Sequence, residues 1–81
     1  MLIASWKSIK PEENRYRHYS LRLEKDLWGD EVLIKRWGRL NERKRENYFW
    51  VKDQGDLLRK IEEVADIREM HGYRLKKNLF N

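Results

Sequence analysis

The chain contains no cysteine, a single proline and four glycines in its 81 residues. Without cysteine there is neither a disulfide framework nor a thiolate metal site. No apolar run approaches the roughly 20 residues that a membrane-spanning helix requires, and no stretch resembling a signal peptide opens the sequence. The length suits one small domain rather than two. We therefore expect a soluble, cytoplasmic, single-domain protein with no membrane partner.

Positive charge is present in excess and is unevenly distributed along the chain. The formal net charge is +5. Residues 35–45 hold six basic side chains against a single acidic one, Glu42, whereas residues 53–71 hold six acidic side chains against three basic ones. A focused basic patch of this kind favours a polyanionic partner. A charged loop that only keeps the surface solvated explains the same residues equally well.

The pattern of apolar side chains in the first two thirds of the chain predicts β-strands. Residues 15–24 alternate with a period of two, which is typical of a half-buried strand. Residues 31–38 are apolar on both parities and predict a central strand, paired antiparallel with the first because the connection 25–30 is short. The aromatic and β-branched residues 48–51 predict a third strong strand. Residues 2–9 predict a short strand at a sheet edge.

Residues 53–71 predict an α-helix that follows these strands. Asp53 fits an N-cap, and Asp56 places a carboxylate near the helix N-terminus. Apolar residues recur at helical spacing after it, and Gly72 is suited to the position that ends a helix. Residues 73–80 are consistent with a last strand or a packed extension. This order of elements indicates an α+β fold, with an antiparallel sheet packed on one helix.

The tripeptide Trp37-Gly38-Arg39 closes the apolar strand and leads into a charged loop, residues 39–47. A guanidinium binds phosphate in a forked geometry, and an indole stacks on sugars or bases. Glycine allows another backbone to approach closely. The tripeptide therefore points to a nucleic-acid contact at the end of a strand. The alternatives are that Trp37 belongs to the core and that Gly38 only marks a bulge or a strand exit.

Four short motifs, in the same order as in the family, resemble the WGR domain. Residues 14–19 are similar to the family's opening Asn-x-x-Arg-x-Tyr strand, and residues 21–29 to its turn ending in Asp-Leu-Trp-Gly. Residues 32–40 resemble the strand that carries the Trp-Gly-Arg signature. His71-Gly72-Tyr73 is similar to the closing Gly-Tyr pair. The chain looks most like the short bacterial stand-alone members of this family.

The resemblance covers residues 14–74 and implies the domain organisation. The single domain, 1–81, would consist of an N-terminal strand or extension (1–13), a WGR-like core and a C-terminal tail (75–81). The implied fold is α+β, a strongly curved antiparallel β-sheet of four to five strands packed on one α-helix. In poly(ADP-ribose) polymerases the related domain binds DNA ends and nicks and relays that signal to neighbouring domains.

By position, the resemblance implies that Trp37 packs on the sugar of a terminal nucleotide and that Arg39 contacts DNA or a partner domain. The sequence departs from the family after Leu40, where Asn41 and basic residues replace the usual glycines. Asparagine tolerates a positive φ, so the turn itself is compatible with this change. The added charge favours phosphate contact over recognition of an end. The candidate nucleic-acid-binding residues are Arg36, Trp37, Gly38, Arg39, Arg43, Lys44 and Arg45.

These features predict a nucleic-acid-binding module, and we favour DNA, as duplex or ends, over RNA. Its rival is a protein–protein interaction adaptor that docks through the same Trp-Gly-Arg edge. His18 and His71 lie far apart in the sequence, and the serines and glycines match no catalytic or phosphate-cradling motif. We therefore expect no enzyme activity, no cofactor, no metal and no small-molecule substrate. Because the helix is net acidic, we also expect it to lie on the face away from the DNA.

Overall fold

The structure, a computed structural model, describes residues 1–78 as one five-stranded sheet with a single α-helix. All strand pairs are antiparallel, and their order across the sheet is β4-β3-β2-β1-β5. The predicted α+β fold is confirmed. The elements are β1 (Leu2–Lys10), the 3-10 turn η1 (Pro11–Glu13), β2 (Arg15–Lys25), β3 (Glu31–Arg39), β4 (Arg45–Trp50), α1 (Gln54–Met70) and β5 (Arg74–Asn78).

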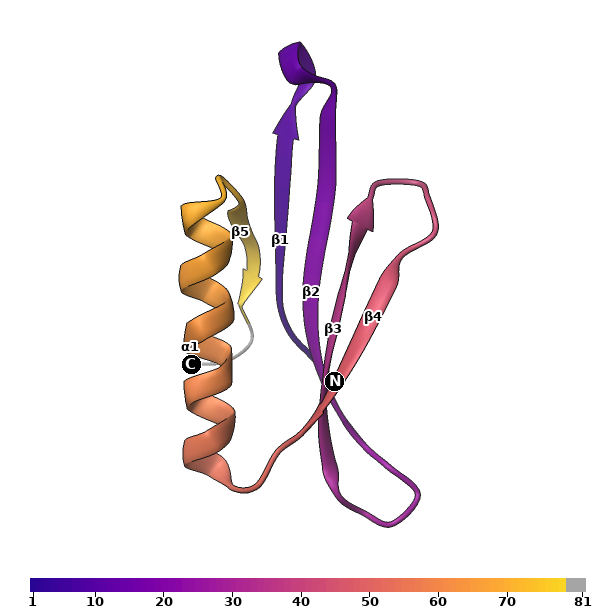
Figure 1. Ribbon diagram of the computed structural model, residues 1–81, viewed down its shortest axis with the longest axis vertical. Helices are drawn as coiled ribbons and strands as arrows, with labels where there is room; N and C mark the ends of the chain where they lie inside the picture. Colours follow the sequence, from indigo (N-terminus) through magenta and orange to yellow (C-terminus); the bar gives the residue numbers. More distant parts are fainter. Residues whose placement is uncertain (79–81) are drawn as a thin grey trace.

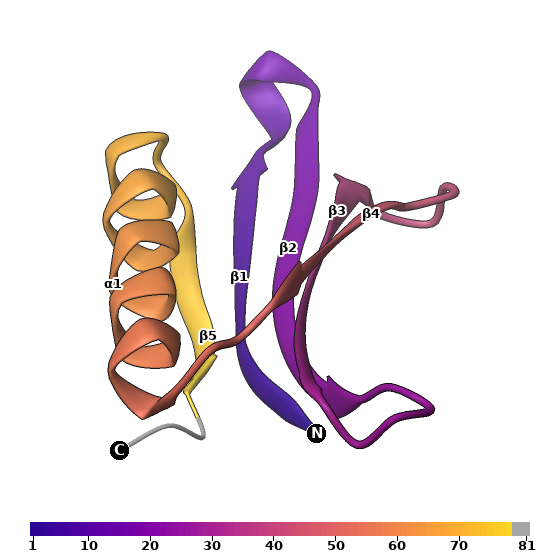
Figure 2. The ribbon, with the colours of Figure 1, turned by 60° about the horizontal axis from the view of Figure 1, so that its bottom comes forward.

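The strands fan out from β5, which lies beside α1, to β3 and β4 on the far side (Figure 1). The chain that leaves β4 crosses back to the start of α1 (Figure 2). In both views the loop between β3 and β4 projects away from the helix. Within residues 1–78, no helix combines the length and the apolar character that crossing a bilayer demands.

The N-terminal segment is an interior strand, and its predicted edge position was wrong. Residues 1–13 contribute β1, which pairs with β2 along its length and with β5 on its other side. The chain returns after α1 so that Lys7 lies opposite both His18 of β2 and Arg74 of β5. The sheet edges are therefore β4 and β5. Of the predicted C-terminal tail, residues 75–78 belong to β5, and residues 79–81 lie outside the described part of the chain.

The charged loop is shorter than predicted. It spans residues 40–44, because β3 extends to Arg39 and β4 already begins at Arg45. Arg45 pairs with Trp37 across the two strands. A charged side chain does not prevent a residue from joining a ladder whose bonds are made by the backbone, since the side chain points into solvent.

The hydrophobic core lies between α1 and one face of the sheet. Trp6, Tyr19 and Leu33 supply this face from three neighbouring strands, and Tyr19 lies directly opposite Trp6. The helix contributes Leu57 and Ile61, which are buried against them. We call this side of the sheet the helix face and the opposite side the open face.

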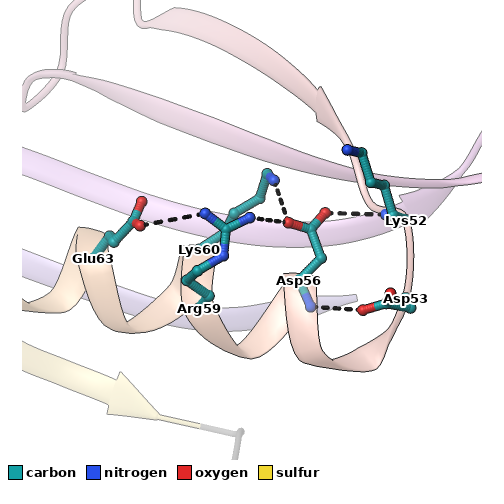
Figure 3. Close-up of polar contacts among 6 residues, drawn as sticks. All are labelled: Lys52, Asp53, Asp56, Arg59, Lys60 and Glu63. Atoms are coloured by element: carbon teal, nitrogen blue, oxygen red, sulfur yellow. Dashed lines mark hydrogen bonds and ion pairs between the residues drawn. The ribbon is translucent and has the colours of Figure 1, made fainter.

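The start of α1 is fixed by two aspartates (Figure 3). Asp53 is the N-cap, as predicted, and its Oδ1 accepts a hydrogen bond from the Asp56 amide at 2.8 Å. The buried Asp56 carboxylate accepts from the Lys52 amide at 3.0 Å, from Lys60 Nζ at 2.7 Å and from Arg59. Lys60 first and the Lys52 amide second hold the pKa of this carboxyl well below its usual range. At the other end, Gly72 has a φ of +79°.

Substitution of the N-cap, Asp53→Ala, is expected to lower the free energy of unfolding by about 1 kcal/mol, because the Asp56 amide loses its acceptor. Urea unfolding followed by circular dichroism measures the change. Asp66→Ala is the matched control, since Asp66 is exposed on α1 and makes no ion pair within residues 1–78. Equal destabilisation by both variants would contradict the assignment of the cap.

Candidate nucleic-acid interface

The Trp-Gly-Arg tripeptide lies at the end of β3, and its side chains are divided between the two faces of the sheet. Trp37 is opposite Tyr19 of β2 and Arg45 of β4, so it belongs to the helix face. Gly38 and Arg36 have the other parity and belong to the open face. The seven candidate residues are therefore brought to one end of the sheet but not to one surface.

Trp37 packs at the margin of the core. Its indole stacks on the Tyr19 ring, with centroids 6.1 Å apart and planes 18° from parallel. The Tyr19 ring in turn meets the edge of Trp6 at 6.0 Å and lies under the Arg68 guanidinium at 4.3 Å. Trp37 is half-buried, between the core on one side and the exposed Arg45 on the other.

Arg39 is engaged by the protein itself. Its Nη1 and Nη2 donate to the carbonyl and the side-chain oxygen of Asn14, both at 3.0 Å. Its Nε lies 3.8 Å from a carboxylate oxygen of Glu42, and its guanidinium lies 5.4 Å from the centroid of the Tyr16 ring. The residue therefore ties the end of β3 to the start of β2. Asn14 adopts a left-handed conformation, with φ +53°, which presents its carbonyl to this contact.

Gly38 makes room for the protein's own loop. Its φ is +155°, and a Cβ built on it would lie 3.1 Å from Lys44 Cδ and 3.4 Å from the Arg43 carbonyl oxygen. Lys44 is fixed there because its Nζ donates to the carbonyls of Arg39 at 2.6 Å and Glu42 at 2.8 Å. The close approach expected of a partner is thus made by the 40–44 loop. Asn41 has a φ of +63°, as its tolerance of this region predicted.

Three arginines at this end remain unpaired. Arg43 is exposed on the loop, Arg45 is exposed opposite Trp37, and Arg17 is exposed opposite Arg39. None of the three guanidinium groups makes a hydrogen bond or an ion pair within residues 1–78. Arg17 was not among the candidate residues. The sequence signal that could have located Arg17 is the period of two along β2, which puts Arg17 on the helix face with Tyr19.

A basic hollow of about 780 Å³ opens on the open face beside the loop. Arg36 lies in it, 3.7 Å from a carboxylate oxygen of Glu46. Burial lowers the pKa of the His18 imidazole in this hollow, and three neighbouring positive charges lower it further: Lys44, Lys7 and Arg36. Four basic side chains line this hollow against two carboxylates, which gives it a positive potential. The hollow is lined by Leu2, Ser5, His18, Ser20, Arg22, Arg36, Glu42, Arg43, Lys44 and Glu46.

The candidate residues also differ in whether they lie on the same side of the sheet as the acidic helix α1. The acidic helix was expected on the side away from DNA, yet Trp37 projects from the helix face. The basic hollow lies on the open face, so the sheet separates it from the helix. Arg43 lies on the loop that projects away from α1 (Figure 2). Phosphates that avoid the helix carboxylates would therefore reach Arg43 and the hollow from the open face. Arg17 and Arg45 lie instead on the helix face, at the same end of the sheet as Trp37.

Comparisons with known proteins assign no family to the chain. No family model matches it, and no solved structure matches it. It is similar to an uncharacterized protein, y4dW, of Sinorhizobium fredii, with 25% identity over 71 residues. The alignment covers 88% of this chain and 35% of that protein, so the chain spans about a third of the length of this relative.

Proposed function

We propose that this chain is a WGR-like module that binds nucleic acid, with duplex DNA as its main ligand, through phosphate contacts at the β3–β4 end of the sheet. The observation that carries the proposal is the set of unpaired guanidinium groups at this end, Arg17, Arg43 and Arg45. The resemblance of four motifs to the WGR family supports it, as does the excess of basic over acidic side chains that line the hollow.

Unpaired arginines suit phosphate binding for an energetic reason. An arginine that already has a carboxylate or amide partner must give up that contact when it binds phosphate, whereas a solvated one exchanges only water and counterions. Arg39 would have to leave Asn14 and Glu42. We therefore propose that Arg17, Arg43 and Arg45 hold phosphate, and that Arg39, the arginine of the motif, positions the strand ends.

In this proposal Trp37 acts mainly by positioning. Its indole is held against Tyr19, and Arg45 lies directly across from it on β4. The ring stiffens the strand end from which Arg45 projects. The exposed part of the indole is accessible for the sugar contact that the family resemblance implies.

A protein-interaction adaptor is the second candidate, and one observation favours it. Leu27 and Trp28, in the turn between β2 and β3, have 95% and 81% of their surface exposed. Two adjacent large apolar side chains in this state are suited to a protein partner. Such an interface depends weakly on salt, whereas phosphate binding falls steeply with it.

The test is the salt dependence of DNA binding by the whole chain. Fluorescence anisotropy with labelled blunt and nicked duplexes, at about 50 and about 200 mM salt, should give a slope of log K against log salt near −3 if about three phosphates are neutralised. Absence of binding at the lower salt by folded protein would refute the proposal. Binding with a slope near zero would favour the adaptor.

A further inference from the structure

We propose that the open face of the sheet binds single-stranded nucleic acid, with bases stacked on Tyr48 and Trp50 and phosphates in the adjoining basic hollow. The inference rests on the proposed function and deepens it, because it assigns single-stranded nucleic acid to the open face, which shares Arg43 with the proposed duplex site. It is carried by an aromatic pair on β4, by the hydrogen bonds that orient this pair, and by its continuity with the hollow.

The aromatic pair is unusually exposed for its position in a sheet. Tyr48 and Trp50 are two residues apart on β4 and so share one face, opposite to that of the core-facing Phe49. Tyr48 has 53% and Trp50 has 60% of its surface exposed. They lie opposite Ile34 and Val32 of β3. Large aromatic residues are normally placed where they bury area, and here more than half of the surface of each residue is left to solvent.

Each ring is oriented by a hydrogen bond from its polar end. Trp50 Nε1 donates to Asp26 Oδ2 at 3.0 Å, and the Tyr48 hydroxyl donates to Glu46 Oε2 at 2.6 Å. The bond from Trp50 is the main cause that holds the pKa of the Asp26 carboxyl below its usual range. These contacts restrict the rotamers of both rings before a ligand arrives. A pre-oriented ring loses less conformational entropy when a base stacks on it.

The aromatic pair and the basic hollow form one continuous surface. Glu46, which accepts from Tyr48, also lies 3.7 Å from Arg36 in the hollow. In the next cross-strand row Tyr48 lies opposite Ile34, and Ile34 lies opposite Arg22, which also lines the hollow. Since neighbouring strands are about 4.8 Å apart, Tyr48 and Arg22 stand roughly 10 Å from each other across the sheet. A single strand of nucleic acid that crosses this surface would meet aromatic and cationic side chains in turn.

This combination selects an unpaired strand over a duplex. In a duplex the base faces are stacked on each other and cannot lie on a protein ring, whereas unpaired bases can be splayed out onto aromatic side chains. A groove of positive charge that follows the backbone, next to rings that take the bases, is the usual arrangement for single strands. The charge of the hollow argues for a polyanionic occupant rather than a second copy of this net-basic chain.

The experiment compares labelled oligothymidylate with a duplex of equal length, by anisotropy at low salt, for wild type and the variant Tyr48→Leu/Trp50→Leu. Leucine keeps apolar contact with Ile34 and Val32 but has no aromatic face. We expect the variant to bind the single strand at least about tenfold more weakly, from the loss of two stacked bases, and to bind the duplex within about twofold of wild type. Trp28→Leu, which removes an exposed ring that belongs neither to the aromatic pair nor to the lining of the basic hollow, should leave both affinities within about twofold.

Unchanged single-strand affinity in the double variant would overturn the inference and leave the proposed function standing. An equal loss in Trp28→Leu would also overturn it, because the effect would then belong to any exposed ring. Single-strand binding without duplex binding would overturn only the duplex part of the proposed function. If the double variant does not fold, tryptophan fluorescence decides: quenching by oligothymidylate should be strong in wild type and much weaker in Trp50→Phe, and equal quenching would refute the inference.

Discussion

Replacement of Trp37 by alanine is expected to lower the free energy of unfolding by about 3 kcal/mol, the lower end of the range for a large aromatic side chain removed from a core. The indole is half-buried and stacks on Tyr19 at 6.1 Å, so its loss removes apolar contact and leaves space beside a buried ring. In a domain whose total stability is on the order of 5–10 kcal/mol, this is a large fraction. Urea unfolding measures it directly.

Two variants separate packing from contact with a ligand. Trp37→Phe keeps a ring on Tyr19 and should cost less than about 1.5 kcal/mol. Trp28→Ala removes an equally large side chain that is 81% exposed and should change stability by no more than about 0.5 kcal/mol. If Trp37→Ala retained full stability and lost only DNA affinity, the indole would be a ligand contact and its place in the core would be refuted.

Local signals in the sequence were sufficient for most of the elements. The period of two in residues 15–24 and the doubly apolar run 31–38 correspond to β2 and β3. Asp53 and Gly72 mark the two ends of α1, because capping and left-handed positions depend on a few adjacent residues. Each of these features is decided within a single turn or strand, so the sequence alone carries it.

The sheet order was not accessible in the same way. β5 consists of five exposed residues, without the apolar alternation that predicts a strand. Its pairing with β1 joins residues about as far apart as the chain allows: Ala4 lies opposite Asn78. Such a pairing depends on where the chain emerges from α1, and no local sequence pattern predicts that position. The edge position assigned to residues 2–9 failed for this reason.

The candidate site was predicted by region but not by surface. Strand parity, together with the antiparallel pairing predicted for residues 15–24 and 31–38, could have placed Trp37 on the face of Tyr19. The partner of Arg39 could not be found in this way, because Asn14 is 25 positions away and owes its role to a left-handed backbone. Nor could the sequence reveal that Gly38 accommodates Lys44, a contact within the β3–β4 connection.

The largest effect on binding is expected from Arg17→Ala/Arg43→Ala/Arg45→Ala. Each unpaired guanidinium that neutralises a phosphate contributes about one to the salt slope, so the slope should fall by about three in magnitude. At about 50 mM salt the affinity for duplex DNA should fall on the order of 100-fold. Because none of the three side chains has a partner within residues 1–78, the free energy of unfolding should change by about 0.5 kcal/mol or less per site.

The control must remove the same charge from other places. Lys25→Ala/Lys52→Ala/Lys76→Ala takes three exposed, unpaired positive charges from outside the β3–β4 end of the sheet. If binding depended only on net charge, the two triple variants would lose affinity equally, and the proposed phosphate site would be wrong. If the contacts are local, the control should lose less than about fivefold and keep its salt slope, because distant exposed charges are largely screened at this ionic strength. The difference in slope, rather than in affinity alone, therefore identifies which arginines meet phosphate.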